Sequence, residues 1–299
     1  MFACADNGRV PMNLTALSLV LGAAVLHAGW NFAAKRVRRG GAAFVWAYYT
    51  AASVLLLPAL VIALVVSDAR PTWTWLVAAL VTAVLHIGYG LVLQRGYDVG
   101  DLSVVYPVAR GTGPLLAVTF AVLLLHERPG PYGLAGAALI IAGVFAISSG
   151  GRQRSARGGL TAGILYGVAT GALIAAYTLW DAYSVTTLAV PPLIYFGAAS
   201  VLQSLFLAPQ VLRRPEQLRL LWKENRREIW VVGILSPMAY LLVLFAMQLA
   251  PVSLVAPARE VSIVLSGLAA WLVLGEANAR RRLVGSAVVL AGIIAIALA

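Results

Sequence analysis

Two arginines and one glutamate lie inside stretches of sequence that are otherwise strongly apolar. Arg110 falls in VVYPVARGTGPLL (104–116), and Arg259 and Glu260 fall in LVAPAREVSIVL (254–265). An ionisable side chain at the centre of a membrane helix costs about 2.5–3.5 kcal/mol, so such residues mark substrate sites, proton pathways or internal ion pairs. The three residues are therefore candidates for a substrate site in which the arginines bind an anionic group and Glu260 balances the charge or relays a proton.

A structural interpretation of the same residues stays open, in which Arg110 and Glu260 form an ion pair between two helices. Arg259 and Glu260 are neighbours, and successive side chains of an α-helix point about 100° apart, so we expect these two not to pair with each other. Pro107 and Pro257 each precede the charged residues by three positions or fewer. Because proline removes a helix hydrogen bond, we expect both helices to be broken there, beside protein or a wet cavity.

Further polar and aromatic residues are candidates for lining the same cavity. Trp30 and Asn31 come late in the first apolar stretch, Trp180 comes late in the sixth, and Tyr106 and His86 lie within two others. Each also has a structural interpretation, as a residue that packs or hydrogen bonds between helices. For His86 this packed role is the favoured one, although histidine is the side chain that titrates near neutral pH.

The composition of the chain indicates a membrane protein. Of its 299 residues, 61% are hydrophobic and 11% are charged, with a mean hydropathy of +0.89, whereas soluble domains carry about 25% charged residues. The net charge of +11 comes from basic residues in short loops between apolar runs, which is typical of a protein in a lipid bilayer and not of a nucleic-acid-binding protein. One cysteine, three scattered histidines and no nucleotide-binding motif predict no metal site and no cofactor.

About 20 apolar residues are needed to cross a bilayer, and ten runs of the chain meet this length. The sequence therefore predicts an all-α integral membrane protein of ten transmembrane helices, at 13–34, 42–66, 72–94, 102–125, 131–149, 159–181, 187–209, 229–249, 252–274 and 281–299. The longest loop, 213–228, is predicted either as an amphipathic helix on the membrane surface or as a solvated loop. Loops that follow odd-numbered helices hold 17 Lys and Arg residues, against 3 in the other loops and the tails. This bias predicts a multi-pass inner-membrane protein with both termini outside the cytoplasm.

The two halves of the chain repeat each other at an offset of about 150 residues. Trp30 matches Trp180, His27 and Asn31 match Tyr177 and Asp181, Pro107 matches Pro257, and Glu127 matches Glu276. Each half has five predicted helices, and five is odd, so the second half enters the membrane upside down. We expect an N-terminal tail (1–12), a first repeat (13–149), a linker (150–158) and an inverted second repeat (159–299).

Four glycines recur in the last predicted helix of each half. Gly136 and Gly143 are seven residues apart, as are Gly285 and Gly292, so each pair lies on one helix face. Glycine lets another backbone come close. We therefore expect helix packing at these faces, either within the chain or between two copies of it in a homodimer.

The sequence resembles the EamA family of the drug/metabolite transporter (DMT) superfamily. The resemblance is carried by LHAGWNFAAKR (26–36), DLSVVYPVARGTGPLL (101–116) and LLLHERPGPYGLAGAALIIAGVFAIS (123–148), and by APVSLVAPAREVS (250–262) and LVLGEANARRRLVGSAVVLAGIIAIAL (272–298) in the second half. It implies a ten-helix, inverted-repeat secondary carrier, many relatives of which export amino acids and other metabolites. Some relatives have both termini in the cytoplasm, unlike the orientation that the charge bias predicts here.

An inverted repeat favours alternating access around a site near the bilayer midplane. The function we expect is therefore secondary active transport of a small polar or anionic, amino-acid-like metabolite, as an exporter. A proton is one candidate for the coupling ion, which the sequence does not identify. The alternatives are an integral-membrane enzyme acting on a lipid-linked or small-molecule substrate, and a passive metabolite channel. The enzyme is disfavoured because DxD, HExxH and GxSxG motifs are absent, and the channel is disfavoured by the paired, proline-containing helices.

Overall fold

A computed structural model describes residues 12–34, 36–37, 41–66, 70–100, 102–148, 160–265 and 279–298. Within these ranges the regular secondary structure is helical, and no β-strand is present. The helices are α1 (Leu14–Ala34), α2 (Gly41–Val66), α3 (Trp73–Val99), α4 (Leu102–Leu124), α5 (Gly130–Ser148), α6 (Leu160–Thr186), α7 (Pro192–Leu212), α8 (Pro215–Leu249), α9 (Val252–Ala258) and α11 (Ala279–Ala297). Residues 261–265 are helical again after a two-residue turn.

Among the described residues, eight helices, α1 to α8, are long and apolar enough to cross a membrane. The chain is therefore a multi-pass membrane protein. The count of ten predicted spans is not confirmed, because α9 is interrupted after Ala258 and α11 is apolar over the shorter segment Leu283–Ala297. Residues 1–11 of the predicted tail, the predicted linker and residues 266–278, which include Glu276, lie outside the described part of the chain.

Several predicted boundaries were wrong by about a helical turn or more. The third helix continues to Val99, the sixth continues to Thr186, and the seventh begins only at Pro192. The segment 213–228 is mostly helical and not a solvated loop, since α8 starts at Pro215 and continues into the bundle through a kink at Asn225 (φ −130°, ψ 22°). Leu221 from this first part of α8 is buried against Phe44 and other apolar residues of α1 and α2.

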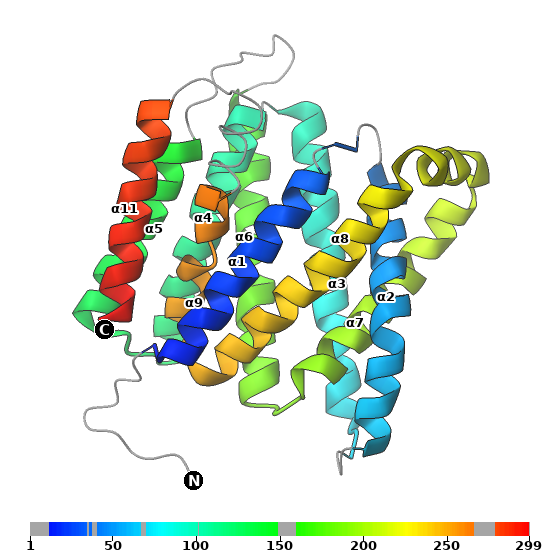
Figure 1. The fold of residues 1–299 in the computed structure, drawn as a ribbon, viewed down its shortest axis with the longest axis horizontal. Helices are drawn as coiled ribbons and strands as arrows, with labels where there is room; N and C mark the ends of the chain where they lie inside the picture. Colours follow the sequence, from blue (N-terminus) through cyan, green and yellow to red (C-terminus); the bar gives the residue numbers. More distant parts are fainter. Residues whose placement is uncertain are drawn as a thin grey trace.

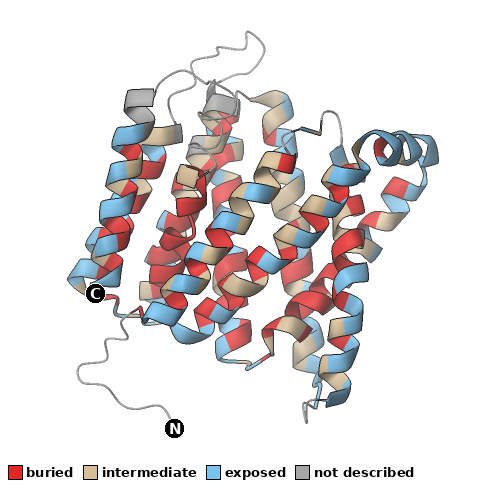
Figure 2. Cartoon of the chain, in the orientation of Figure 1, coloured by how far each residue is buried: buried red, intermediate tan, exposed pale blue. Residues whose placement is uncertain are grey.

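The helices pair across the two halves as an inverted repeat requires. Helix α1 packs against α8, and its counterpart α6 packs against α3, the counterpart of α8. Helices α5 and α11 lie side by side at one edge of the bundle (Figure 1). The start of α1 and the end of α11 lie at the same end of the bundle, which agrees with the even number of crossings in the prediction. Buried residues line the helix contacts, whereas the outer faces are largely exposed (Figure 2), as expected for surfaces that meet lipid.

The four predicted packing glycines all lie on the contact between α5 and α11. A Cβ atom at position 136 would lie 2.6 Å from the carbonyl oxygen of Gly292, and one at position 143 would lie 2.8 Å from that of Gly285. The two helices therefore touch backbone to backbone within one chain.

A second close approach positions the charged helix α4. A Cβ atom at Gly167 would lie 2.7 Å from Cβ of Val108, and one at Gly171 would lie 2.7 Å from Cβ of Thr112. These two glycines of α6 therefore hold the turn of α4 that carries Arg110 close against the second half of the molecule.

Candidate substrate site

Helix α4 carries Arg110 in its third turn. The structure has α4 as one helix from Leu102 to Leu124, so the predicted break at Pro107 is not observed. Pro107 is the sixth residue of this helix. Its missing N–H removes one helix hydrogen bond, the bond to the carbonyl of residue 103, just after the first four N–H groups, which have no partner within a helix in any case. Arg110 is therefore held on a continuous helix.

The equivalent segment of the second half is broken after Pro257. Helix α9 ends at Ala258, residues 259–260 form a turn, and a helix resumes at Val261. Across the turn the backbone bonds span three residues: the N–H of Glu260 donates to the Pro257 carbonyl at 2.9 Å, and that of Ile263 donates to the Glu260 carbonyl at 2.9 Å. This tight geometry is of the 3₁₀ kind.

Glu127 of the first half fixes the start of the broken helix. Its two carboxylate oxygens accept hydrogen bonds from the backbone N–H groups of Val252 and Ser253, each at 2.8 Å. A carboxylate at a helix N-terminus satisfies unpaired N–H groups and interacts favourably with the helix dipole. Glu127 therefore ties the end of α4 in one repeat to the start of α9 in the other.

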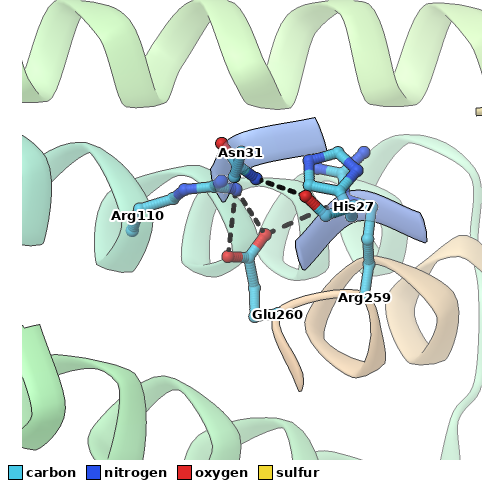
Figure 3. Close-up of polar contacts among 5 residues, drawn as sticks. All are labelled: His27, Asn31, Arg110, Arg259 and Glu260. Carbon is cyan, nitrogen blue, oxygen red and sulfur yellow. Dashed lines mark hydrogen bonds and ion pairs between the residues drawn. The ribbon is translucent and has the colours of Figure 1, made fainter. Parts of the chain in front are cut away.

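Arg110 and Glu260 face each other between the two halves (Figure 3). Nη1 of Arg110 lies 3.2 Å from Oε2 and 3.4 Å from Oε1 of Glu260. The side chain of Glu260 is 1% exposed and that of Arg110 is 12% exposed, so water screens the pair little. The ion pair that the sequence left open as an alternative is therefore formed in this conformation.

Arg259 is a second cation at the same carboxylate. Its Nε lies 3.8 Å from Oε1 of Glu260, so the prediction that these neighbours would not pair was wrong. The reason is the turn at 259–260, where the regular 100° step of an α-helix does not hold. Among the residues that the structure describes, Arg259 Nε has no hydrogen-bond partner, although it is buried.

Helix α1 closes the site from a third side. Asn31 Nδ2 donates to the carbonyl of His27 at 2.8 Å, one turn earlier on the helix. The two side chains lie beside the guanidinium groups of Arg110 and Arg259 (Figure 3), and both charges act on His27. Tyr106 lies one turn before Arg110 on α4, with its ring centre 5.6 Å from the guanidinium carbon, a cation–π distance.

The remaining predicted site residues lie away from the Arg110–Glu260 pair. The ring of Trp30 contacts that of His27 edge-on at 4.8 Å but packs against the apolar cluster around Phe44. Trp180 donates its Nε1–H to the carbonyl of Ala78 at 3.0 Å, which is a hydrogen bond between α6 and α3.

His86 belongs to an aromatic cluster formed by α3, α6 and α8. Its ring stacks on Tyr177 at 4.1 Å, and the ring of Tyr240 lies edge-on at 5.3 Å. Its Nδ1 is 2.9 Å from the carbonyl oxygen of Thr82. His86 is therefore packed and hydrogen bonded within this cluster and makes no direct contact with Glu260 or Arg110 among the interactions of the described residues.

The arrangement at Glu260 has a definite chemical preference. Two guanidinium groups share one carboxylate, so these three side chains carry a net positive charge. Guanidinium groups bind carboxylates and phosphates through paired N–H groups. The site is therefore suited to an anionic group that competes with Glu260 for the two arginines.

Comparison with known proteins supports the architecture and the family. A family described as the EamA-like transporter family matches residues 14–149 and again residues 161–298, which fits an inverted repeat of two EamA units. No curated protein matches the sequence. One solved structure, whose description reads "Crystal structure of protein", has a TM-score of 0.75 to this chain. The two are 18% identical, over 95% of this chain and 96% of the other, so the similarity shows the fold alone. Because the family covers both halves, the chain belongs to the EamA-like transporter family of the DMT superfamily.

Proposed function

We propose that the chain is a secondary active carrier that exports a small polar or anionic, amino-acid-like metabolite across the cytoplasmic membrane by alternating access. The observation that carries this proposal is the closed site at Glu260, where two arginines from opposite halves meet a single carboxylate. Its net positive charge suits the carboxylate of an amino acid. Its place between two inverted repeats suits a site that opens alternately to either side.

In this proposal the membrane is crossed ten times. Helices α1 to α8 make the first eight crossings. The ninth crossing begins with the broken helix α9, and α11 makes the tenth. Interrupted helices in carriers expose backbone groups and side chains to the substrate near the midplane. The turn at Arg259 and Glu260 is such an interruption.

Substrate binding in this scheme replaces one anion by another. In the closed conformation Glu260 neutralises Arg110 at 3.2 Å and approaches Arg259 at 3.8 Å. A substrate carboxylate that takes the place of Glu260 on Arg110 loosens the contact between α4 and the segment after α9. The two halves are then free to move relative to each other, which links binding to opening.

Replacing Arg110 by alanine should reduce transport by about ten- to a hundredfold, because a hydrogen bond to a charged group contributes about 1.5–3 kcal/mol. The test measures uptake of labelled amino acids into proteoliposomes, with and without a pH gradient. Arg95→Ala, which removes an exposed arginine of α3, is the matched control and should transport like the wild type.

Arg110→Lys separates a binding role from a purely structural one. Lysine keeps the charge that Glu260 needs but lacks the planar fork that binds a carboxylate through two N–H groups. We expect this variant to be folded, eluting as a single symmetrical peak, and still impaired in transport. Wild-type transport in both Arg110 variants would show that the residue does not bind substrate.

The orientation follows from the 17 to 3 bias of basic residues between the two sets of loops. We expect the C-terminus outside the cytoplasm, together with the turns before α7 and before α9. Alkaline phosphatase fused after Ala299 should therefore be active in intact cells, while green fluorescent protein at the same position should be dark. A bright fluorescent fusion with an inactive phosphatase would reverse the orientation.

A further inference from the structure

Asp181 is a completely buried carboxylate near the end of α6. Its Oδ1 accepts a hydrogen bond from the hydroxyl of Tyr195 on α7 at 2.6 Å, and its Oδ2 accepts one from the hydroxyl of Tyr240 on α8. Three helices of the second half therefore meet at one acidic side chain.

Asp181 has no cation beside it. Within the part of the chain that the structure describes, no Lys, Arg or His nitrogen lies within ion-pair distance of its carboxylate. This sets Asp181 apart from Glu260, which has Arg110 and Arg259 beside it. Buried carboxylates are usually paired with a cation, so a carboxylate held only by two tyrosine hydroxyls is a candidate for a functional role.

The surroundings can accept the rearrangement that protonation requires. A protonated Asp181 has an O–H that donates to the oxygen of Tyr195 or Tyr240, so that tyrosine must turn its own O–H to another acceptor. Ser184 lies within interaction range of the Tyr195 hydroxyl, as does Thr82. The hydroxyl oxygen of Ser184 is buried and has no hydrogen-bond partner among the described atoms.

The titratable and charged groups around this carboxylate come from every neighbouring helix. They are His86 on α3, Tyr177 on α6, Tyr195 on α7, Tyr240 on α8 and, farther away, Arg259 after α9 and Arg110 on α4. Tyr177 is central, because it stacks on His86 and is within range of the charges of Asp181, Arg259, Arg110 and Glu260. The charge state of Asp181 therefore acts on groups that border the candidate substrate site.

A surface pocket lies where α6 ends and α7 begins. The pocket has a volume of about 460 Å³ and is lined by Val185, Thr186, Ala189, Pro191, Pro192 and Gln248. Val185 is four residues after Asp181, a rise of about 6 Å along the axis of α6. The proposed orientation places this pocket on the outer side, from which a proton drives export.

We propose that Asp181 binds the proton whose inward movement drives transport. A proton from the outer side neutralises the carboxylate, one tyrosine hydroxyl turns away from it, and the contact among α6, α7 and α8 changes. The first half has no such group, because its matching residue is Asn31, which does not titrate. The coupling is thus confined to one of the two repeats. This inference rests on the proposed carrier function.

The first test needs no substrate. Infrared difference spectra of the purified protein between acidic and alkaline pH should show the carbonyl band of a protonated carboxylic acid. Asp181→Asn keeps the size and polarity of the side chain and should lose the component of this band that comes from a buried carboxylic acid, while the components from exposed carboxylic acids remain. The matched control Asp98→Asn removes an exposed carboxylate at the end of α3 and should keep it.

A second variant keeps the test decisive if Asp181→Asn fails to fold. Tyr195→Phe removes one hydrogen bond to the ionised carboxylate, and should therefore give a stronger acid band than the wild type at the same pH. An unchanged band in Tyr195→Phe, or a spectrum of Asp181→Asn identical to that of the wild type, would overturn the proposal.

The second test separates this inference from the carrier function. Proteoliposomes containing Asp181→Asn should lose accumulation of labelled amino acids driven by a pH gradient, while exchange without a gradient continues. Gradient-driven accumulation equal to that of the wild type would refute the role of Asp181 and leave the carrier function intact. Absence of both accumulation and exchange in the wild type, with the infrared band present, would instead refute the carrier function.

Discussion

Glu260→Gln should lower the free energy of unfolding by about 3–5 kcal/mol, because breaking a buried ion pair leaves an uncompensated charge in the interior. Glu260 is 1% exposed, and it is the anion that both Arg110 and Arg259 approach, at 3.2 Å and 3.8 Å. Glutamine retains the shape of the side chain but supplies no negative charge to either arginine.

Arg110→Met should destabilise the protein less than Glu260→Gln does. When Arg110 is removed, Glu260 still has Arg259 beside it, and methionine replaces the stem of the arginine with a side chain of similar length. The measurement is the midpoint of thermal unfolding in detergent for the two single variants and the double variant. Because the residues are in contact, the double variant should differ from the sum of the single effects by about 0.5–3 kcal/mol.

The control for this series is Glu224→Gln, which removes an exposed glutamate from the first part of α8. Substitutions on an exposed surface change stability by about 0.5 kcal/mol or less. If Glu260→Gln unfolds at the same temperature as this control, the ion pair does not hold the halves together in the free protein.

The internal repeat was enough to relate Arg110 to Glu260 from the sequence. The offset of 150 residues places Arg110 opposite Glu260, and the structure joins these two residues directly. Apolar run lengths were likewise enough to locate α1, α2, α4 and α5 to within about one residue, because a span must cover about 30 Å of hydrocarbon. They were not enough for the end of α3 or for the division between α6 and α7, because α6 continues past the polar residue Asp181 as far as Thr186.

The second cluster was not predictable in the same way. Asp181 appears in the sequence as the counterpart of Asn31, but its hydrogen-bond partners Tyr195 and Tyr240 are 14 and 59 residues away on other helices. No spacing rule connects residues of three helices before their packing is known. The sequence therefore did not predict that Asp181 is buried and has no cation within ion-pair distance among the described residues.

Local departures from regular helix geometry explain the remaining differences. The contact between Arg259 and Glu260 depends on the turn after Pro257, whereas Pro107 at the matching position leaves α4 continuous. Glu127, near the end of α4, caps α9 from 125 residues away. A proline removes one helix hydrogen bond but does not by itself determine whether the helix breaks. Whether it breaks depends on the residues packed around each segment.

Gly136→Leu should cause the other large effect, because it forces a side chain into a contact between two backbones. A Cβ atom at this position would lie 2.6 Å from the Gly292 carbonyl oxygen and 2.9 Å from the backbone nitrogen of Ile296. Neither atom can move without shifting α11 as a whole. Overpacking of this kind costs about 3 kcal/mol or more when backbone must move, and we expect a corresponding loss of thermal stability in detergent.

Gly90→Leu is the matched control, because a Cβ atom at Gly90 would meet nothing within 4 Å. This variant replaces a helical glycine of α3 in the same way, and its melting temperature should stay close to that of the wild type.

A double variant tests whether the two glycines act on one contact. Gly292 faces Gly136 reciprocally, since its own Cβ would lie 2.7 Å from the Gly136 carbonyl oxygen. Once alanine at position 136 has separated the helices, alanine at position 292 has less to disturb, so the double variant should lose less stability than the sum of the two. Strict additivity would show that the two glycines do not act on one contact.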